Sequence, residues 1–338
     1  MRAIPVIALT GYLGAGKTSL LNHVLQAPGA RIGVVINDFG EINVDAALVT
    51  GQVDEPVSIT GGCVCCLPDE GGLDDALEKL TDPRLALDVI IVEASGLADP
   101  VAISRLIRFS GVERVRPGGV VDVIDAATHF DMVDLGGIPP ARYGAASLVV
   151  VNKLDQIPER NRAAELDRIE TRVRERNPHA HVVGTTGARI DPTLLYDVSD
   201  ADEGSGQLSF RELLLDAGSD PHDHVHAASV TSTSDGCLDP GALLDLLEEP
   251  PAGVYRLKGT VAVRYRGRVR TYVVNVVGSS IHVATAPPTA RANCLVAIGT
   301  HFDVENTRTL VAAALRPHDG IVAAAGIRRL QRYRRLSF

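Results

Sequence analysis

Apolar residues in the first half of the chain form short unbroken runs, which alternate with segments of helical spacing. The runs predict buried parallel strands, and the segments between them predict amphipathic helices. The predicted strands are 4–9, 32–36, 89–92, 119–124, 148–151 and 182–184, and the predicted helices are 18–25, 73–80, 103–109 and 159–175. This alternation predicts an α/β fold, a parallel sheet with helices on both faces. The loops after the strands then share one edge.

The pattern changes near residue 197, where residues 197–206 are polar and rich in Gly, Ser and Asp. Asp239 and Pro240 then open a predicted helix at 238–247, as N-cap and first helical residue. Further strands are predicted at 254–264, 268–277, 281–284 and 295–298, and a helix at 305–315. We therefore predict a domain with a parallel sheet over 1–197, a linker over 198–226 and a smaller α+β domain with an antiparallel sheet over 227–338.

The overall composition is that of a globular protein. Of 338 residues, 45% are hydrophobic and 22% are charged, and the net charge of −9 argues against a general nucleic-acid binder. No apolar run reaches the roughly 18 residues of a membrane span, and no signal peptide is recognisable. The expected location is the cytoplasm, and the oligomeric state, including a homo-oligomer, stays open.

The end of the chain differs from the rest because it is strongly basic. Five arginines crowd its last eleven residues: Arg328, Arg329, Arg332, Arg334 and Arg335. Such a cluster is read either as a solvated basic tail or as an electrostatic contact with RNA, the ribosome or an acidic partner.

Residues 11–18 read G-Y-L-G-A-G-K-T and fit the phosphate-binding loop G-x-x-x-x-G-K-[ST]. The loop follows an apolar strand and precedes a helix, which is the context that such a loop requires. Lys17 is expected to reach the β- and γ-phosphates, and Thr18 is expected to bind Mg²⁺. The other residues expected to contact the phosphates are Gly11, Gly14, Ala15, Gly16 and Ser19.

Glu93 ends the predicted strand beside the loop strand, which is the Walker B position. Its carboxylate is expected to hold or orient the water shell of Mg²⁺, although a solvated strand-end carboxylate is the simpler alternative. Gly96 follows in E-A-S-G and can give its amide to a γ-phosphate.

Asn152, Lys153 and Asp155 form N-K-L-D at the end of another predicted strand. The carboxylate of Asp155 can accept two hydrogen bonds from guanine, whereas adenine offers no such pair of donors. Asn152 would hold the loop and touch the base, and Lys153 would lay its stem along the ring. Thr185, Thr186 and Ala188, after the last strand, can complete the pocket. The sequence therefore predicts binding of GTP and GDP.

Cys63, Cys65 and Cys66 are three of the five cysteines, within four positions. Thiolates are strong ligands for Zn²⁺, and three of them leave one tetrahedral position open. An incomplete site suits metal transfer, while buried thiols or a redox cluster are the alternatives. Cys237 and Cys294 stand alone and are expected to be buried.

Asp38 and Glu41 lie in N-D-F-G-E after the second predicted strand, where a switch segment is expected. Asp38 is a candidate Mg²⁺ contact and catalytic residue, and Glu41 is a candidate zinc ligand. The alternative is an acidic surface loop. His222, His224 and His226 alternate along the predicted linker, as a metal tether or as polar linker residues.

These motifs together resemble the CobW family of P-loop GTPases. The resemblance rests on G-Y-L-G-A-G-K-T, N-D-F-G-E, G-G-C-V-C-C at 61–66, E-A-S-G-L-A-D-P at 93–100 and N-K-L-D, and it covers almost the whole chain. It implies a GTP-dependent metallochaperone, with zinc or cobalt at Cys63, Cys65 and Cys66 and release controlled by the nucleotide. Some members carry a glutamate where this chain has Ile36, so a carboxylate ligand must come from elsewhere.

The resemblance also implies a metal-requiring client protein. Two other functions stay open at this point. One is a GTP-switched regulator of zinc starvation that recruits a partner such as the ribosome, and the other is a cobalt-handling factor for cobalamin synthesis.

Overall fold

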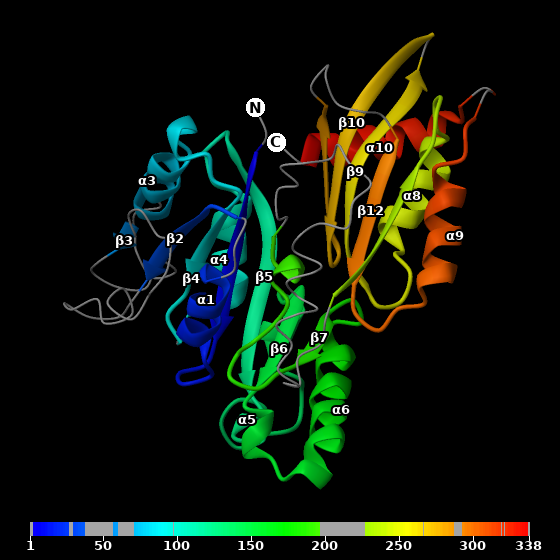
Figure 1. The fold of residues 1–338 in the computed structure, drawn as a ribbon. Helices are drawn as coiled ribbons and strands as arrows, with labels where there is room; N and C mark the ends of the chain where they lie inside the picture. Colours follow the sequence, from blue (N-terminus) through cyan, green and yellow to red (C-terminus); the bar gives the residue numbers. More distant parts are fainter. Residues whose placement is uncertain are drawn as a thin grey trace.

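The computed structural model describes residues 3–26, 30–37, 57–59, 71–96, 98–196, 227–265, 267–286, 293–318, 320 and 322–336. These residues form two β-sheets that lie side by side, each with its own helices (Figure 1). The first sheet belongs to the N-terminal part of the chain and the second to the C-terminal part.

The first sheet has seven parallel strands in the order β3-β2-β4-β1-β5-β6-β7. The strands are β1 (Ile4–Gly11), β2 (Ile32–Asn37), β3 (Val57–Ile59), β4 (Val89–Glu93), β5 (Val115–Asp125), β6 (Leu148–Asn152) and β7 (His181–Gly184). The predicted α/β class is confirmed. Because every pair is parallel, the carboxyl ends of β1, β4 and β6 meet at one edge, called the carboxyl edge below.

Helices cover both faces of this sheet, as the periodicity predicts. They are α1 (Lys17–Leu25), α3 (Gly71–Leu80), α4 (Pro100–Arg108), α5 (His129–Met132) and α6 (Glu159–Arg176), with short 3₁₀ turns η2 (Pro83–Leu85), η3 (Ala141–Gly144), η4 (Leu154–Gln156) and η5 (Pro192–Leu194). Alternate residues of one strand face opposite layers. Ile7 packs in the core beneath α1, and Val6 packs in the core beneath α3 and α4.

Helix α4 begins three residues before the predicted start at residue 103. Asp99 accepts a hydrogen bond from the Val101 amide at 2.9 Å, and Pro100 occupies the first helical position. A capping carboxylate followed by proline is a strong helix start, because proline lacks the amide that would be unpaired there. The apolar spacing alone does not reveal this turn.

The second sheet is antiparallel, in the order β11-β10-β9-β12-β8, and carries its helices on one face. Its elements are β8 (Ala228–Thr233), α8 (Pro240–Glu248), β9 (Val254–Tyr265), β10 (Arg268–Val277), β11 (Ser280–Thr285), β12 (Cys294–Gly299), α9 (Val304–Ala314) and α10 (Ala324–Leu336). The predicted α+β architecture of this part is confirmed.

Strand β8 is one of the elements that the hydrophobic pattern does not predict, and β3, α5 and α10 are others. It reads A-S-V-T-S-T, and Val230 is its one residue buried below a tenth of full exposure. It lies at the sheet edge and pairs only with β12. An edge strand needs little apolar surface, so backbone pairing rather than periodicity forms it.

The basic end of the chain is a packed helix over residues 324–336, and the reading as a solvated tail is wrong there. Ile327 and Leu330 of α10 are buried in the core of the second sheet. Arg329 forms ion pairs of 2.8 Å with Asp245 and 2.6 Å with Glu248 of α8. One of the five arginines is therefore used inside the fold.

Contacts between the two sheets lie at the edge opposite the carboxyl edge, called the amino edge below. Tyr255 and Val277 of the second sheet pack into the core beneath α1. His181, at the start of β7, stacks on Tyr255 and lies 2.8 Å from the Thr300 hydroxyl through its Nε2. The C-terminal region thus docks away from the predicted nucleotide site.

Three other predictions have different outcomes. Cys237 is buried as expected, whereas Cys294 is only half-buried. Within the described ranges, no helix is long and apolar enough to cross a membrane. The domain boundaries predicted at 197 and 226 fall in residues outside the described ranges and stay a prediction, as does any role of His222, His224 and His226.

Candidate functional site

Backbone geometry at the predicted phosphate loop requires glycine at two positions. Gly11 has a φ of 150° and Gly16 a φ of 107°, which side-chain-bearing residues rarely adopt. A Cβ on Gly11 would lie 2.6 Å from the Val123 carbonyl oxygen, and one on Gly16 would lie 2.4 Å from Asn152 Nδ2. The loop is therefore held close to β5 and β6 by contacts that only glycine permits.

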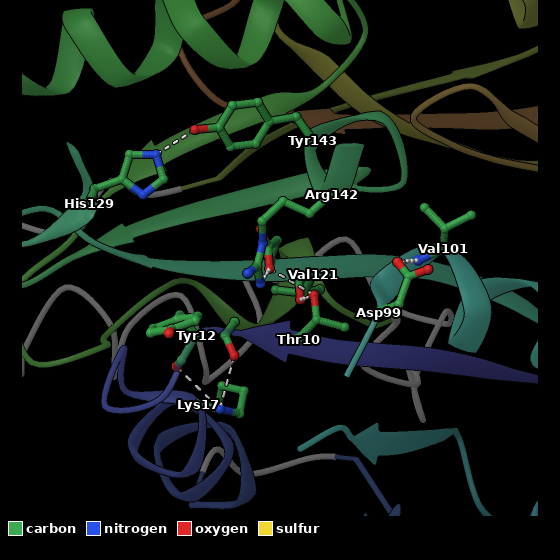
Figure 2. A network of polar contacts seen from close by, with 11 residues as sticks. Thr10, Tyr12, Lys17, Asp99, Val101, Val121, His129, Arg142 and Tyr143 are labelled. Atoms are coloured by element: carbon green, nitrogen blue, oxygen red, sulfur yellow. Dashed lines mark hydrogen bonds and ion pairs between the residues drawn. The ribbon is translucent and has the colours of Figure 1, made fainter. Parts of the chain in front are cut away.

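Lys17 lies in the first turn of α1 and is 8% exposed. Its ammonium donates to the Gly11 carbonyl at 3.1 Å and to the Tyr12 carbonyl at 3.4 Å (Figure 2). The positive charge therefore lies inside the curve of the loop. Ala15 is buried at the base of the loop, while Gly14 and Ser19 are exposed.

Thr18 and Glu93 meet across two neighbouring strands. Thr18 Oγ1 donates to Glu93 Oε1 at 2.9 Å, and Glu93 is 1% exposed at the end of β4. A hydroxyl beside a carboxylate offers the hard oxygen ligands that Mg²⁺ prefers. Gly96 is buried against the loop as well, since a Cβ there would lie 2.7 Å from Leu13 Cδ2.

Asn152 joins the phosphate loop to the predicted base-recognition loops. Its Nδ2 donates to the Ala15 carbonyl at 2.9 Å, and its Oδ1 accepts from the Ala188 amide at 2.8 Å. Both bonds are buried, and Asn152 is the last residue of β6. One side-chain amide therefore fixes the spacing between loops that are far apart in the sequence.

Lys153 and Asp155 follow Asn152 at the mouth of the same loop. Lys153 has a φ of 63°, and its ammonium pairs with Asp125 at 2.7 Å. Asp155 lies exposed in η4, where its carboxylate can meet a ligand. Of the three predicted pocket residues after β7, Thr185 and Ala188 are buried and Thr186 is exposed.

The sequence reasoning missed a buried ion pair behind the loop. Asp122 of β5 is fully buried and accepts from Arg142 Nη2 at 2.7 Å and from Arg142 Nε at 2.9 Å. Thr10 of β1 also donates to Asp122, at 2.9 Å (Figure 2). A charged residue inside the apolar run 119–124 was the available signal, because a buried carboxylate needs a partner.

A second network fixes the segment after β5, near Tyr12 and Leu13. His129 is hydrogen-bonded to Tyr143, which also donates to Asp134 at 3.2 Å. Burial lowers the pKa of His129 to about 4, so the ring is neutral near pH 7. Hydrogen bonds from Arg172 lower the pKa of Asp134. Neutral His129 is a positioning group in this network.

The predicted metal residues lie outside the described residues: Cys63, Cys65, Cys66, Glu41 and Asp38. Among the residues that the structure describes, no group of three or more His, Cys, Asp or Glu side chains could hold a metal ion. The flanking elements are described, since β3 ends at residue 59 and α3 begins at residue 71. The cysteine segment therefore connects to the sheet at the carboxyl end of β3.

Two family models match this chain. The model described as the CobW/HypB/UreG nucleotide-binding domain matches residues 5–184, and that described as the cobalamin synthesis protein cobW C-terminal domain matches residues 227–315. The first match covers more than half of the chain.

Similar proteins include two that are named zinc chaperones. YjiA of Escherichia coli is 32% identical over 205 residues, which cover 59% of this chain and 63% of YjiA, and so less than two thirds of that relative. CobW of a Sinorhizobium species is 29% identical over 349 residues, which cover 92% of this chain and 97% of that protein. The crystal structure of Zn(II)-bound YjiA GTPase superposes with a TM-score of 0.44 at 23% identity, over 93% of this chain and 99% of that one.

Proposed function

This chain belongs to the CobW/HypB/UreG family of P-loop GTPases, and on that premise we propose that it is a GTP-hydrolysing zinc chaperone that delivers the ion to a client protein. The observation that carries the nucleotide half is the side chain of Asn152, which binds both the phosphate loop and the loop of Ala188. The two ends of a nucleotide would contact these loops.

The residues of the carboxyl edge have different proposed roles in binding the nucleotide. Amides of Gly11, Gly14, Ala15, Gly16 and Ser19 would surround the phosphates, and the amide of Gly96 would approach the γ-phosphate. The ammonium of Lys17 would leave the carbonyls of Gly11 and Tyr12 to neutralise the charge that develops between the β- and γ-phosphates.

Thr18 and Glu93 are the described residues that fit Mg²⁺, because their oxygens lie 2.9 Å apart beside the loop. Mg²⁺ held there would neutralise negative charge on the phosphates. Asp38 is a further proposed contact, on sequence grounds alone. Glu93, buried at the end of β4, would hold or orient the water shell of that ion.

Base selection is assigned to Asp155, with Asn152 holding its loop and the stem of Lys153 beside the ring. The pairing of Lys153 with Asp125 fixes that stem. Replacing Asp155 by Asn exchanges two acceptor oxygens for one oxygen and a donor amide. GTP should then bind at least about tenfold more weakly, because one guanine donor loses its partner. Unchanged GTP affinity of Asp155→Asn in a fluorescent-nucleotide titration would remove this assignment.

The zinc half of the proposal rests on Cys63, Cys65 and Cys66 and on the relatives named zinc chaperones. The segment that contains these cysteines follows β3 in the chain, and β2 and β4 separate β3 from β1 in the sheet. At about 4.8 Å between neighbouring strands, the end of β3 lies roughly 15 Å from the end of β1. The segment between β3 and α3 is long enough to span that distance, so it could respond to the nucleotide. Glu41 is the proposed additional ligand.

The test is the zinc affinity of the full chain, measured by competition with a chromophoric chelator. We expect different affinities with a GTP analogue, with GDP and without nucleotide, and loss of the site in a variant with all three cysteines changed to serine. Equal affinities in the three states would overturn nucleotide control. Tighter binding of Co²⁺ than of Zn²⁺ by the cysteine site would favour the cobalt-handling alternative.

The regulatory alternative, recruitment of RNA or the ribosome, would use the remaining arginines of α10. Arg328, Arg332 and Arg335 are exposed, whereas Arg329 pairs with α8. Truncating α10 would remove buried Ile327 and Leu330, so charge reversal of the three exposed arginines is the cleaner test. Loss of ribosome co-sedimentation with intact zinc transfer would favour this alternative.

A further inference from the structure

A cleft of about 690 Å³ lies at the amino edge, between the first sheet and the turn that joins β10 to β11. One wall is helix α4, from Val101 in its first turn to Phe109 at its C-cap. The opposite wall is η3 with the segment after α6, and Ser279 and Ser280 close one side. Its size is within the range of ligand-binding sites. The cleft reaches the first turn of α4 at Val101, but none of the residues assigned to the nucleotide lines it.

The floor of the cleft is apolar and is formed by both parts of the chain. Val6 and Val120 come from the first sheet, and Val277 comes from the end of β10. Gly119 permits this junction, because a Cβ there would lie 2.9 Å from Val277 Cγ1. The cleft therefore depends on the docking of the two sheets.

The rim of the cleft is positively charged. Arg105 and Arg108 come from α4, and Arg176 comes from the end of α6. All three are exposed, and among the described residues none of their guanidinium groups forms an ion pair or hydrogen bond. Arg176 lies over Gly144, where a Cβ would come within 3.8 Å of its Nε. The cations thus flank an apolar floor from two helices.

An aromatic side chain adds apolar surface to this rim. Phe109, at the C-cap of α4, also lines the cleft and is 78% exposed, although a large apolar side chain is normally covered. Exposed aromatic and arginine side chains together are typical of protein interfaces. Ser104 and Ser280 supply hydroxyl groups between the cations.

The ligand chemistry follows from this combination. A single phosphate group is held best by donors that converge on it, whereas Arg105 and Arg108 come from α4, Arg176 comes from the end of α6, and all three are exposed. A long polyanion such as RNA would meet the net charge of −9 of the whole chain. A short segment with carboxylates on both sides of apolar residues satisfies the floor and the rim together.

We propose that this cleft docks an acidic, apolar segment of a partner protein, with its carboxylates on Arg105, Arg108 and Arg176 and its apolar side chains on Phe109 and the valine floor. The docking needs neither nucleotide nor zinc, so it goes beyond the proposed chaperone function and can hold if that function fails.

The probe is a fluorescein-labelled peptide in which glutamate residues alternate with leucine, titrated with the full chain and followed by anisotropy. A variant with Arg105→Glu and Arg108→Glu should bind it at least about tenfold more weakly. One exposed ion pair contributes little affinity, so the variant reverses two charges and replaces two attractions by two repulsions. Phe109→Ser should reduce the affinity several-fold at unchanged charge. Added salt should weaken binding by the wild-type chain.

Arg270→Glu is the matched control, because Arg270 is also exposed and lies on β10, about 25 Å from its cleft end. It should leave the affinity unchanged. GTP turnover should also be unchanged in every variant, which separates this inference from the proposed function. Three results would overturn the proposal: no binding by the wild-type chain, equal losses in the cleft and control variants, or tighter binding of single-stranded RNA or inorganic phosphate than of the peptide.

Discussion

The two edges of the seven-stranded sheet are built by different kinds of contact. At the carboxyl edge, residues of short motifs form the hydrogen bonds: Lys17 donates to the Gly11 carbonyl, Thr18 donates to Glu93, and Asn152 donates to the Ala15 carbonyl. At the amino edge, side chains of two sheets meet, as in the stacking of His181 on Tyr255. The carboxyl edge depends on polar residues of fixed type, which the predicted nucleotide chemistry requires. The amino edge depends on the packing of side chains that belong to no motif. Substitutions should therefore affect activity at one edge and stability at the other.

Lys17→Ala at the carboxyl edge should have the largest effect. Loss of a positioned cation beside the phosphates is expected to lower the turnover number for GTP by about 10²–10³-fold, with little change in the thermal unfolding midpoint. Phosphate release at saturating GTP measures it. A variant that hydrolyses GTP normally would show that residues 11–18 are not the phosphate loop.

Asn152→Ala should reduce both nucleotide binding and stability, because this side chain lies in the predicted site and is also buried. The Ala15 carbonyl and the Ala188 amide would both lose a buried partner, at a cost of about 1–3 kcal/mol each in unfolding free energy. GTP affinity should fall as well. Urea denaturation and nucleotide titration measure the two effects, and a fall in affinity at unchanged stability would contradict the bridging role.

Gly119→Ala tests the amino edge with a readout of stability alone. Gly119 has a φ of 107°, and a Cβ there would lie 2.6 Å from Ser147 Oγ. We expect a loss of about 2–3 kcal/mol in unfolding free energy, from backbone strain and overpacking together. Turnover per folded molecule should not change.

The matched control for that substitution is Gly267→Ala, in the β9–β10 turn. Its φ is 73°, but no atom lies within 4 Å of the added Cβ, so it should lose only the strain of about 1 kcal/mol. Equal losses in the two variants would show that the close contact at Gly119 contributes nothing.

His181→Gln should have the smallest effect, visible only as a function of pH. Burial, with smaller contributions from Arg174 and His301, lowers the pKa of His181 to about 4 from 6.5. The unfolded chain therefore binds a proton first as the pH falls, so neutral His181 stabilises the fold above pH 6.5 and this stability is lost between pH 6.5 and 4. The variant should lose less stability across that window, by about 1–2 kcal/mol, in urea titrations at each pH. An identical pH dependence in the wild type would contradict this role.

The sequence predicted every described strand of the parallel sheet except β3, because buried parallel strands are short continuous apolar runs, here bounded by turn residues. It also predicted the positions of Lys17, Thr18 and Asn152, because these motifs have fixed spacing between a strand and a loop. It missed β8, whose polar residues form a strand only by pairing with β12. Its reading of the basic end as a tail failed because the partners of Arg329 lie more than eighty residues away.

The amino edge and its cleft were not predictable from the sequence in any part. Arg116 and Asn275, which interact there, are 159 positions apart, and neither belongs to a motif. The Asp122–Arg142 pair at the carboxyl edge could not be identified from the sequence either. A carboxylate within an apolar run does indicate that a partner exists, but not which residue it is. Periodicity reveals most of the elements that form, but contacts between distant elements depend on how those elements dock.

The amide of Asn152 makes the distance between the two halves of the site a property of the protein itself. A nucleotide consists of a base and a phosphate chain joined by a ribose. A site that holds its base-binding and phosphate-binding loops at a fixed distance selects ligands whose linker matches that distance. Linking fragments that fit a rigid gap gives a chelate gain, because the second fragment binds at high effective concentration. Guanosine and pyrophosphate offered separately would each miss this gain, so the two buried bonds of Asn152 would favour whole nucleotides in addition to any contact that its side chain makes with the base.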